Sequence, residues 1–392
     1  MIYLDFAATT PVDARVLNAM LPYFNADYGN PSSIHRHGQK AEAAVDNARE
    51  KVAAILHCLP EEILFTSGGT ESDNLALRGC ALRKTPSNGT KRILTARTEH
   101  HAISRTAEML EREHGIPVMW LEVDSYGAVL PQVLERGLHV PGAMVSLMMA
   151  NNEIGTINPI ETLSQMARTH GAVIHSDAVQ AAAYLDLNLE SLGVDMLSLG
   201  GHKFYGPKGI GALFVRKGIN LVPQISGGGQ EFGMRSGTHN VPYIVGFAEA
   251  LQLASNEREF RCAHVKPLRD RIIGTVLEQV VDSALTGHPD RRMPNHASFV
   301  FKDVDGNALL QLLDASGFAC SSGSACKTGN PEPSEVISAL GITKDWALGS
   351  LRITLGVSST ESDVDRFLVA LPGLVEKARG LMRKNHSAPG VN

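Results

Sequence analysis

The sequence predicts an α/β protein, with a large domain built on a mainly parallel sheet and a smaller α+β unit after it. Short apolar runs recur between residues 32 and 254, and segments with helical periodicity separate them. Runs that are apolar on both faces are typical of parallel strands covered by helices on two sides. A long, highly charged helical pattern over residues 256–279 then leads into further strand-like runs, which indicates a second unit.

The expected elements follow the chain in order. Strands that alternate with helices favour a parallel arrangement, with ligand chemistry at the strand ends. In the large domain we expect strands at 62–66, 92–96, 143–147, 172–175 and 196–199. In the second unit we expect strands at 296–301 and 351–355, and helices at 307–315, 334–340 and 362–371. The tail after Lys384 has little apolar material to bury and is expected to fray.

Composition narrows the classes of function. The 392 residues carry a formal net charge of −5, so no basic surplus favours nucleic acid or an anionic membrane as a partner. No apolar run reaches the roughly 20 residues of a membrane span, and the first residues lack a secretory pattern, so we expect a cytoplasmic protein. The five cysteines are odd in number and scattered, which argues against a disulfide framework and for a reduced, working thiol.

A glycine-rich turn, Ser67–Asn74, follows the first of these strands and opens a helical pattern. Backbone N–H groups at such a helix start can cradle a phosphate, and Ser67 and Thr70 add hydroxyls. A plain strand-to-helix turn explains the same residues, and from this segment alone it is the stronger interpretation. The chain has neither G-x-G-x-x-G after a strand nor G-x-x-x-x-G-K-[ST], so any phosphate bound here is not that of NAD or ATP.

Two charged residues stand at the ends of apolar strands. Lys203 lies in the glycine-flanked segment Gly200–Gly209, where loss of hydration would lower the pKa of the amine and make it a nucleophile for a carbonyl. Taken alone, a surface lysine is the more ordinary interpretation. Asp177 follows another strand, where a buried acid requires a cation or a strong donor; a helix N-cap explains it about equally well.

His100 and His101 follow the strand at 92–96, and Asn152 follows the strand at 143–147. Adjacent histidines point in different directions, and the chain has no H-E-x-x-H motif or paired-cysteine spacing, so we expect no metal site. An imidazole that stacks on an aromatic ligand, or that carries a proton, fits this position better.

Cys326 lies in a segment rich in glycine, serine and proline, which predicts an exposed, mobile loop and not a core position. The neighbouring Lys327 favours the thiolate, so Cys326 is a candidate nucleophile; a neutral surface cysteine is the alternative. Cys320, beside Phe318 and Ala319, is expected to be a buried structural residue.

In this order, the segments together resemble one family, the cysteine desulfurases of the NifS/IscS type, within the class V, fold-type I pyridoxal phosphate enzymes. The resemblance extends to about Leu371. It implies a seven-stranded, mainly parallel sheet in a large domain at residues 15–255, and a small α+β domain of residues 1–14 and 256–392 that carries the Cys326 loop. The matching motifs are Tyr3–Pro11, Gly29–Ser33, Thr66–Asn74, Thr98–His100, Asn151–Gly155, His175–Gln180, Gly201–Lys203, Gly227–Thr238 and Ser321–Cys326.

The resemblance implies a role for each residue around the cofactor ring. Lys203 holds pyridoxal 5'-phosphate covalently, and Asp177 pairs with the ring nitrogen so that the ring accepts electrons. His100 stacks on the ring face and belongs to the catalytic set. Gln180 and Asn152 contact the ring oxygen, and Asn152 also faces the substrate.

The resemblance also implies how the phosphate and the substrate are held. Arg352, on a strand of the small domain, binds the substrate carboxylate with its planar fork. The phosphate is held by Gly69, Thr70 and His202, and by Thr238 from the second subunit of a homodimer.

The implied reaction converts L-cysteine to L-alanine. Lys203 removes the Cα proton, and the Cys326 thiolate takes the substrate sulfur and keeps it as a persulfide. The persulfide then passes its sulfur to an acceptor protein, a scaffold or a sulfur carrier. The spacing Ser321–Cys326 resembles the branch with the longer loop, which is associated with iron-sulfur cluster assembly and tRNA thiolation. The rival interpretations are another pyridoxal phosphate enzyme of this fold (a selenocysteine lyase or an aminotransferase) and an inactive sulfur-delivery scaffold.

Three features depart from the family pattern. Gly200 stands where the family usually has a phosphate-binding serine. The missing hydrogen bond is expected to weaken cofactor binding by about 1 kcal/mol, which does not abolish it. Phe232 replaces an arginine, which is expected to change loop or dimer contacts. The segment from Pro372 onward does not match the tail that docks a scaffold protein, so the sequence leaves the acceptor open.

Overall fold

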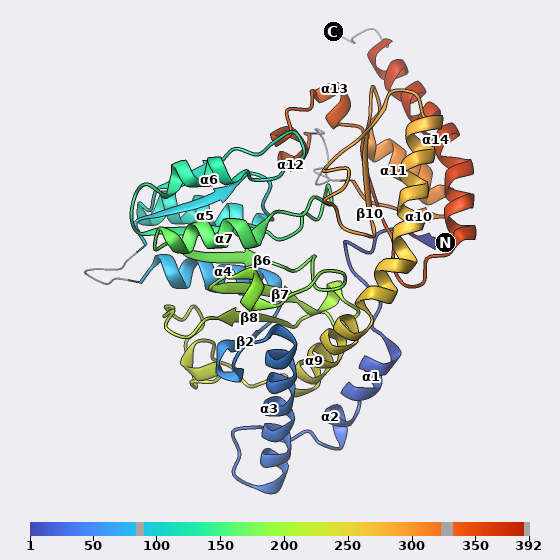
Figure 1. The fold of residues 1–392 in the computed structure, drawn as a ribbon. Helices are drawn as coiled ribbons and strands as arrows, with labels where there is room; N and C mark the ends of the chain where they lie inside the picture. The colour runs from blue at the N-terminus through green and yellow to red at the C-terminus, as the bar shows by residue number, and fades with distance from the viewer. Residues whose placement is uncertain (84–89, 323–331, 388–392) are drawn as a thin grey trace, which may run out of the picture.

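The computed structural model describes residues 1–83, 90–322 and 332–387, with side chains as far as residue 382. Its centre is a seven-stranded sheet (Figure 1). The strands are β2 (Ile63–Thr66), β3 (Arg92–Ala96), β4 (Val118–Leu121), β5 (Ala143–Ser146), β6 (Val173–Asp177), β7 (Met196–Gly200) and β8 (Gly211–Val215).

The strand order in this sheet is β2-β8-β7-β6-β5-β3-β4. The five strands from β7 to β4 are parallel, and β8 runs antiparallel to both of its neighbours. β2 therefore points the same way as the parallel strands. The mainly parallel, seven-stranded sheet that the resemblance implied is confirmed.

Helices cover both faces of this sheet (Figure 1). Along the chain they are α1 (Ala14–Met20), α2 (Pro22–Asn25), α3 (Arg36–Leu56), α4 (Gly69–Ala81), α5 (His101–His114), α6 (Pro131–Leu138), α7 (Ile160–Thr169), α8 (Leu189–Leu192) and α9 (Val241–Asn256). Short 3-10 turns are η1 (Pro60–Glu62), η2 (Gly201–Lys203) and η3 (Glu231–Gly233). Among the described residues, no helix is long and apolar enough to cross a bilayer.

Each strand of the large sheet is apolar at successive positions because it packs into two cores. Neighbouring side chains along a strand point to opposite faces. Ile93 and Met144 share a core with Leu77 of α4. Leu94 and Val145, one position further along the same strands, belong to the core on the other face, with α3, α7 and α9. Full burial of one such side chain contributes about 1.5–3 kcal/mol, so both faces stabilise the sheet.

A smaller assembly follows α10 (Arg258–Gln279). Its antiparallel sheet has the order β12-β10-β9. The N-terminal strand β1 (Ile2–Tyr3) pairs with β11 (Phe318–Ala319), so the start of the chain lies beside this assembly (Figure 1). The other elements are β9 (Ser283–Leu285), β10 (His296–Phe301), β12 (Ser350–Thr354), α11 (Gly306–Ala315), α12 (Glu335–Ala339), α13 (Lys344–Ala347) and α14 (Glu361–Ser387).

The final helix is longer than the sequence pattern predicts. The pattern ends it at Leu371 and lets the chain fray after Lys384, whereas α14 continues through Pro372 to Ser387. A proline inside a helix costs about 3 kcal/mol, because it lacks an N–H donor and crowds the preceding turn. The turns after it are nevertheless buried, with Val375 fully enclosed in the main core. This burial outweighs the cost of the proline.

Candidate active site

Five strand ends meet at one edge of the large sheet and enclose a cavity of about 280 Å³. β2, β3, β5, β6 and β7 point the same way, so the segments that follow them converge. Of the predicted site residues within the described part of the chain, all except Thr238 line this cavity: Gly69, Thr70, His100, Asn152, Asp177, Gln180, His202, Lys203 and Arg352.

The glycine-rich turn brings the start of α4 to the cavity. A Cβ at residue 69 would lie 2.5 Å from Cγ2 of Val179, so only glycine allows this close approach. The first N–H groups of a helix have no intrahelical partner, and Gly69 and Thr70 place them at the cavity wall. The geometry therefore favours an anion cradle over a plain turn.

Lys203 ends the turn η2, directly after β7. Its Nζ donates hydrogen bonds to the backbone oxygens of Ala7 (2.6 Å) and Ala8 (2.8 Å). Burial, and then the guanidinium of Arg352, lower the pKa of the Lys203 amine from 10.5 to about 8. Lys203 is thus not a surface lysine. A sizeable fraction of its amine is neutral near pH 7 and can attack a carbonyl carbon.

Covalent capture of pyridoxal phosphate by the cofactor-free protein is expected to depend on pH through Lys203. Only the neutral amine attacks the aldehyde, so the capture rate should rise roughly tenfold per pH unit below pH 8 and level off above it. Stopped-flow absorbance, with borohydride trapping and peptide mapping of the labelled lysine, measures this rate. An inflection near the ordinary lysine pKa of about 10.4 would contradict the assignment.

Asp177 and His100 add an acid and an imidazole to the cavity wall. Asp177 is 6% exposed, and its Oδ1 accepts a hydrogen bond from Val179 N at 2.8 Å. Burial raises the pKa of Asp177, while His100, the Val179 amide and Lys203 oppose that rise. His100 caps α5, since its Nδ1 accepts the N–H of Ala102 at 3.1 Å. Burial lowers the pKa of His100, so the neutral ring carries its proton on Nε2.

A layer of buried polar groups lies next to Asp177, and no sequence pattern pointed to it. Asp73 of α4 lines the cavity with 1% exposure, and its Oδ1 has no hydrogen-bond partner among the described residues. This oxygen is 3.7 Å from Nε2 of His175. The two ring nitrogens of His175 contact the hydroxyls of Ser146 and Ser198, each at 2.9 Å. Burial raises the pKa of Asp73 well above its usual range, and burial lowers the pKa of His175 to about 3, so the His175 ring is neutral at pH 7.

Arg352 enters the cavity from β12. Its Nη2 pairs with Oδ1 of Asp5 at 2.8 Å, and its Nη1 donates to the backbone oxygen of Asn152 at 3.0 Å. His296 Nε2 contacts the same Asn152 oxygen at 3.2 Å. Two nitrogens of the guanidinium are thus held, which fixes its plane, and the remaining N–H groups can bind a carboxylate. The role of Asp5 was not predicted, although it lies within the N-terminal motif.

Three further cysteine and threonine predictions have different outcomes. Cys326 is outside the described part of the chain, so its place at the site stays a prediction. Thr238 is exposed and does not line the cavity, and its contact with a second subunit also stays a prediction. Cys320 is half-buried, where full burial was expected, and burial followed by the charge of Asp5 raises the pKa of its thiol. It is therefore a poor nucleophile.

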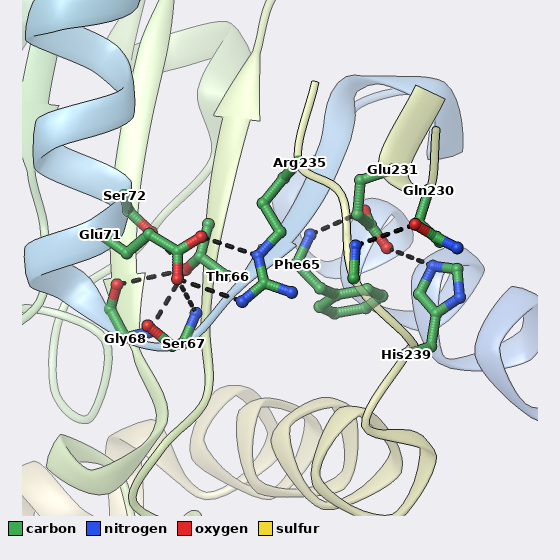
Figure 2. A network of polar contacts seen from close by, with 11 residues as sticks. Phe65, Thr66, Ser67, Gly68, Glu71, Ser72, Gln230, Glu231, Arg235 and His239 are labelled. Carbon is green, nitrogen blue, oxygen red and sulfur yellow. Dashed lines mark hydrogen bonds and ion pairs between the residues drawn. The ribbon is translucent and has the colours of Figure 1, made fainter. Parts of the chain in front are cut away.

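The loop Gly227–Thr238 is anchored by a buried carboxylate, Glu231 (Figure 2). Glu231 is 5% exposed and accepts from both Nη atoms of Arg49, each at 2.8 Å. It also accepts the N–H of Phe65 at 2.8 Å and contacts Nε2 of His239 at 2.9 Å. Burial raises the pKa of Glu231, but the hydrogen bonds from His239 and Arg49 hold it below its usual value. The carboxylate therefore stays charged and fully paired.

A second ion pair ties this loop to the glycine-rich turn (Figure 2). Glu71 of α4 accepts from Arg235 Nε at 2.8 Å. Its other oxygen accepts the N–H of Ser67, also at 2.8 Å. The start of α4 and the loop are consequently held in one arrangement.

Arg49→Met is expected to lower the free energy of unfolding by about 3–5 kcal/mol, because it leaves the Glu231 carboxylate buried without its bidentate partner. Urea unfolding at pH 7 measures this change in the free energy of unfolding. Arg15→Met is the matched control, since Arg15 pairs with Asp13 on the surface and its loss should cost less than about 1 kcal/mol. Equal losses of unfolding free energy in the two variants would show that the buried ion pair stabilises the fold no more than the surface pair does.

The departures at Phe232 and Gly200 can be placed in the structure. Phe232 has a left-handed φ of 55° and is 58% exposed, and the Arg49 guanidinium lies 5.1 Å from its ring centre. At Gly200, a Cβ would lie 3.3 Å from Cγ1 of Val179 and 3.4 Å from the nitrogen of Gly69. A serine would fit there only if Val179 shifted by a few tenths of an ångström.

The groups in the cavity fit a phosphorylated pyridine aldehyde. Lys203 offers an amine for the aldehyde, and Asp177 offers a carboxyl for a ring nitrogen. The close approach at Gly69 leaves a helix start free for a phosphate. Each part of pyridoxal phosphate thus finds a chemically suitable group.

The chain belongs to the aminotransferase class-V family, whose pattern it matches over residues 2–367. Members of this family depend on pyridoxal phosphate. Within it, the chain falls in the branch of IscS- and NifS-type cysteine desulfurases. The cysteine desulfurase IscS of Dictyoglomus turgidum is 42% identical over 378 residues, which cover 96% of this chain and 95% of that protein. The IscS-like cysteine desulfurase of Mycobacterium tuberculosis is 43% identical over 383 residues, 97% of each chain.

Solved structures agree with this placement. A NifS-like protein superposes with a TM-score of 0.88 at 36% identity, covering 96% of this chain and 99% of that one. SspA, solved in complex with cysteine, superposes with a TM-score of 0.79 at 32% identity and covers 92% and 100% of the two chains. The predicted fold and family are confirmed.

Proposed function

We propose that this protein is a cysteine desulfurase, which converts L-cysteine to L-alanine and holds the removed sulfur as a persulfide on Cys326. One observation carries the proposal: a single cavity joins the Lys203 amine, the Asp177 carboxyl and the Arg352 guanidinium. An aldehyde cofactor and an α-amino acid substrate require these three groups. When bound, pyridoxal phosphate supplies an electron sink for negative charge at the substrate Cα.

The chain's own residues would hold the cofactor from several sides. Lys203 binds its aldehyde carbon, and Asp177 holds the proton of its ring nitrogen. His100 covers the ring, and Gln180 and Asn152 contact its oxygen. The phosphate lies against Gly69, Thr70 and His202, with Thr238 of a second copy completing its shell.

Lys203 moves the proton during catalysis. The Lys203 amine, whose pKa is lowered to about 8 by burial, would remove the Cα proton of bound cysteine. The carbonyls of Ala7 and Ala8, which accept its hydrogen bonds here, give this amine a resting place beside the cavity. Arg352 holds the substrate carboxylate, which fixes the direction in which Cβ and its sulfur point.

The Cys326 thiolate takes up the sulfur. An S–S bond forms between Cys326 and the substrate sulfur while the Cβ–S bond breaks. The electron pair of that bond goes to carbon, which is protonated to give alanine, so carbon is reduced and sulfur is oxidised. No external oxidant is required, and the persulfide is the activated form passed to an acceptor.

The proposal extends to the protein's surroundings. We place it in the cytoplasm as a homodimer, delivering sulfur to a scaffold or carrier protein for iron-sulfur clusters or tRNA thiolation. Free thiols at Cys58, Cys80 and Cys262 suit a reducing compartment. The exposed loop that carries Thr238 suits contact with a second subunit.

We also propose that the chain divides into a large domain of residues 15–255 and a small domain of residues 1–14 with 256–392. The pairing of β1 with β11 supports this division. The bridge between Asp5 and Thr354 also joins the N-terminal segment to the small sheet.

One experiment tests the reaction. The purified enzyme is incubated with L-cysteine labelled on sulfur, alanine is quantified, and the label is located by peptide mass spectrometry. We expect equal amounts of alanine and transferred sulfur, with the label on the Cys326 peptide. Alanine without a labelled peptide would favour a lyase that releases sulfur directly, and 3-mercaptopyruvate, the keto acid that keeps the sulfur, would favour an aminotransferase reaction.

A further inference from the structure

Tyr205 stands two residues after Lys203 in an unusual backbone conformation. Its φ is 69°, in the left-handed region, and its side chain is 4% exposed. A bulky residue rarely adopts this conformation, and such strain persists only where surrounding contacts hold it, often at functional sites. Tyr205 has no role in the proposed reaction.

The backbone of Tyr205 is bound to the N-terminal segment. Its N–H donates to Oγ1 of Thr10 at 2.8 Å, and its carbonyl accepts the N–H of Asp13 at 3.0 Å. Residues 7–8 of the same segment supply the carbonyls that hold the Lys203 amine. The turn that carries the lysine and the segment that receives its amine are therefore fixed to each other.

The side chain of Tyr205 reaches the strand that carries Arg352. Its hydroxyl oxygen accepts the N–H of Val357 at 2.9 Å. The Tyr184 hydroxyl donates to the carbonyl of Leu355 at 3.2 Å. Leu355 and Val357 directly follow β12, only a few residues after Arg352. The two tyrosines thus hold the end of this strand.

A buried cation holds the ring of Tyr205 in place. The guanidinium of Arg261, on α10, lies 5.0 Å from the ring centre, and Arg261 is 1% exposed. Its Nη2 pairs with Glu257 at 3.0 Å. A desolvated guanidinium over an aromatic face is a favourable contact, so the ring cannot swing away without cost.

We propose that Tyr205 is a positioning residue that sets the separation between the Lys203 amine and the Arg352 guanidinium. An α-amino acid must present its amine at the position of Lys203 and its carboxylate to Arg352 at the same time. A fixed separation favours substrates with one carbon between the two groups. This inference rests on the proposed function, in which Arg352 binds the substrate carboxylate.

Tyr205→Phe in the cofactor-loaded enzyme tests the inference with two ligands. Cysteamine has the amine and thiol of L-cysteine but no carboxylate. The apparent dissociation constant of L-cysteine, from stopped-flow changes in cofactor absorbance, should rise about tenfold, since the N–H of Val357 loses its acceptor. The apparent dissociation constant of cysteamine should change less than about twofold. Tyr243→Phe, in α9 and packed against Phe24, is the matched control and should change neither.

Two further measurements separate the possible outcomes. Hydrogen exchange on the cofactor-free protein should speed up at the Val357 amide in Tyr205→Phe and stay unchanged at the β2 amides. Arg352→Gln should remove the preference for L-cysteine over cysteamine. If Arg352→Gln removes this preference and Tyr205→Phe leaves it intact, Tyr205 does not position the site. If Tyr205→Phe weakens the binding of both ligands equally, the role of Tyr205 is purely structural. If Arg352→Gln leaves the preference intact, the proposed carboxylate site is wrong.

Discussion

Lys203→Ala is expected to lower the rate of alanine formation from L-cysteine at least about 10³-fold, and to abolish the yellow absorbance of covalently bound cofactor. The substitution removes both the amine that captures the aldehyde and the base that moves the Cα proton, and loss of a positioned base alone costs about 10²–10⁴-fold. Absorbance spectra and an alanine assay at saturating cofactor measure the two effects.

Lys208→Ala is the matched control for this variant. Lys208 lies in the same glycine-flanked segment but is exposed and does not line the cavity. It should keep both colour and activity. If Lys203→Ala kept more than a tenth of the wild-type rate, another group would have to be the base and the proposed use of the cavity would fail.

Cys326→Ala is expected to lower sulfur transfer more than about 100-fold while the cofactor colour stays unchanged. Without the thiolate, the substrate sulfur has no acceptor, whereas the groups that bind the cofactor are untouched. Sulfide release in the presence of a reductant and mass spectrometry of the persulfide measure the loss.

Cys320→Ala serves as the control for Cys326→Ala. Its thiol has a raised pKa, so its removal should leave turnover within about twofold of the wild type. Release of sulfide by Cys326→Ala at the original rate would rule out the persulfide route and leave direct elimination from the substrate.

The convergence at the cavity could be predicted because the residues that form it follow strands. Gly69, Asp177 and Lys203 each come directly after an apolar run, and parallel strands bring their carboxyl ends to one edge. No single segment could decide between a functional and an ordinary interpretation, because each one alone also fitted a turn, a helix cap or a surface lysine. Only the order of all the motifs along the chain favoured the functional interpretation.

Other parts of the site depend on contacts that no local pattern contains. Asp5 contacts Arg352 over 347 positions of the chain, and Tyr205 contacts Val357 over 152. The strand β8 was also missed, and its antiparallel course is what turns β2 towards the other strand ends. The predicted helix ended at Leu371, directly before Pro372, whereas burial of the turns beyond the proline carries α14 on to Ser387.

The ion pair between Asp5 and Arg352 joins residues 347 positions apart, so the pocket is complete only after two segments made at very different times have met. Contacts this distant along the chain form slowly. The carbonyls that hold the reactive amine belong to the same early segment. A nascent chain that has not yet reached Arg352 consequently has an unfinished pocket.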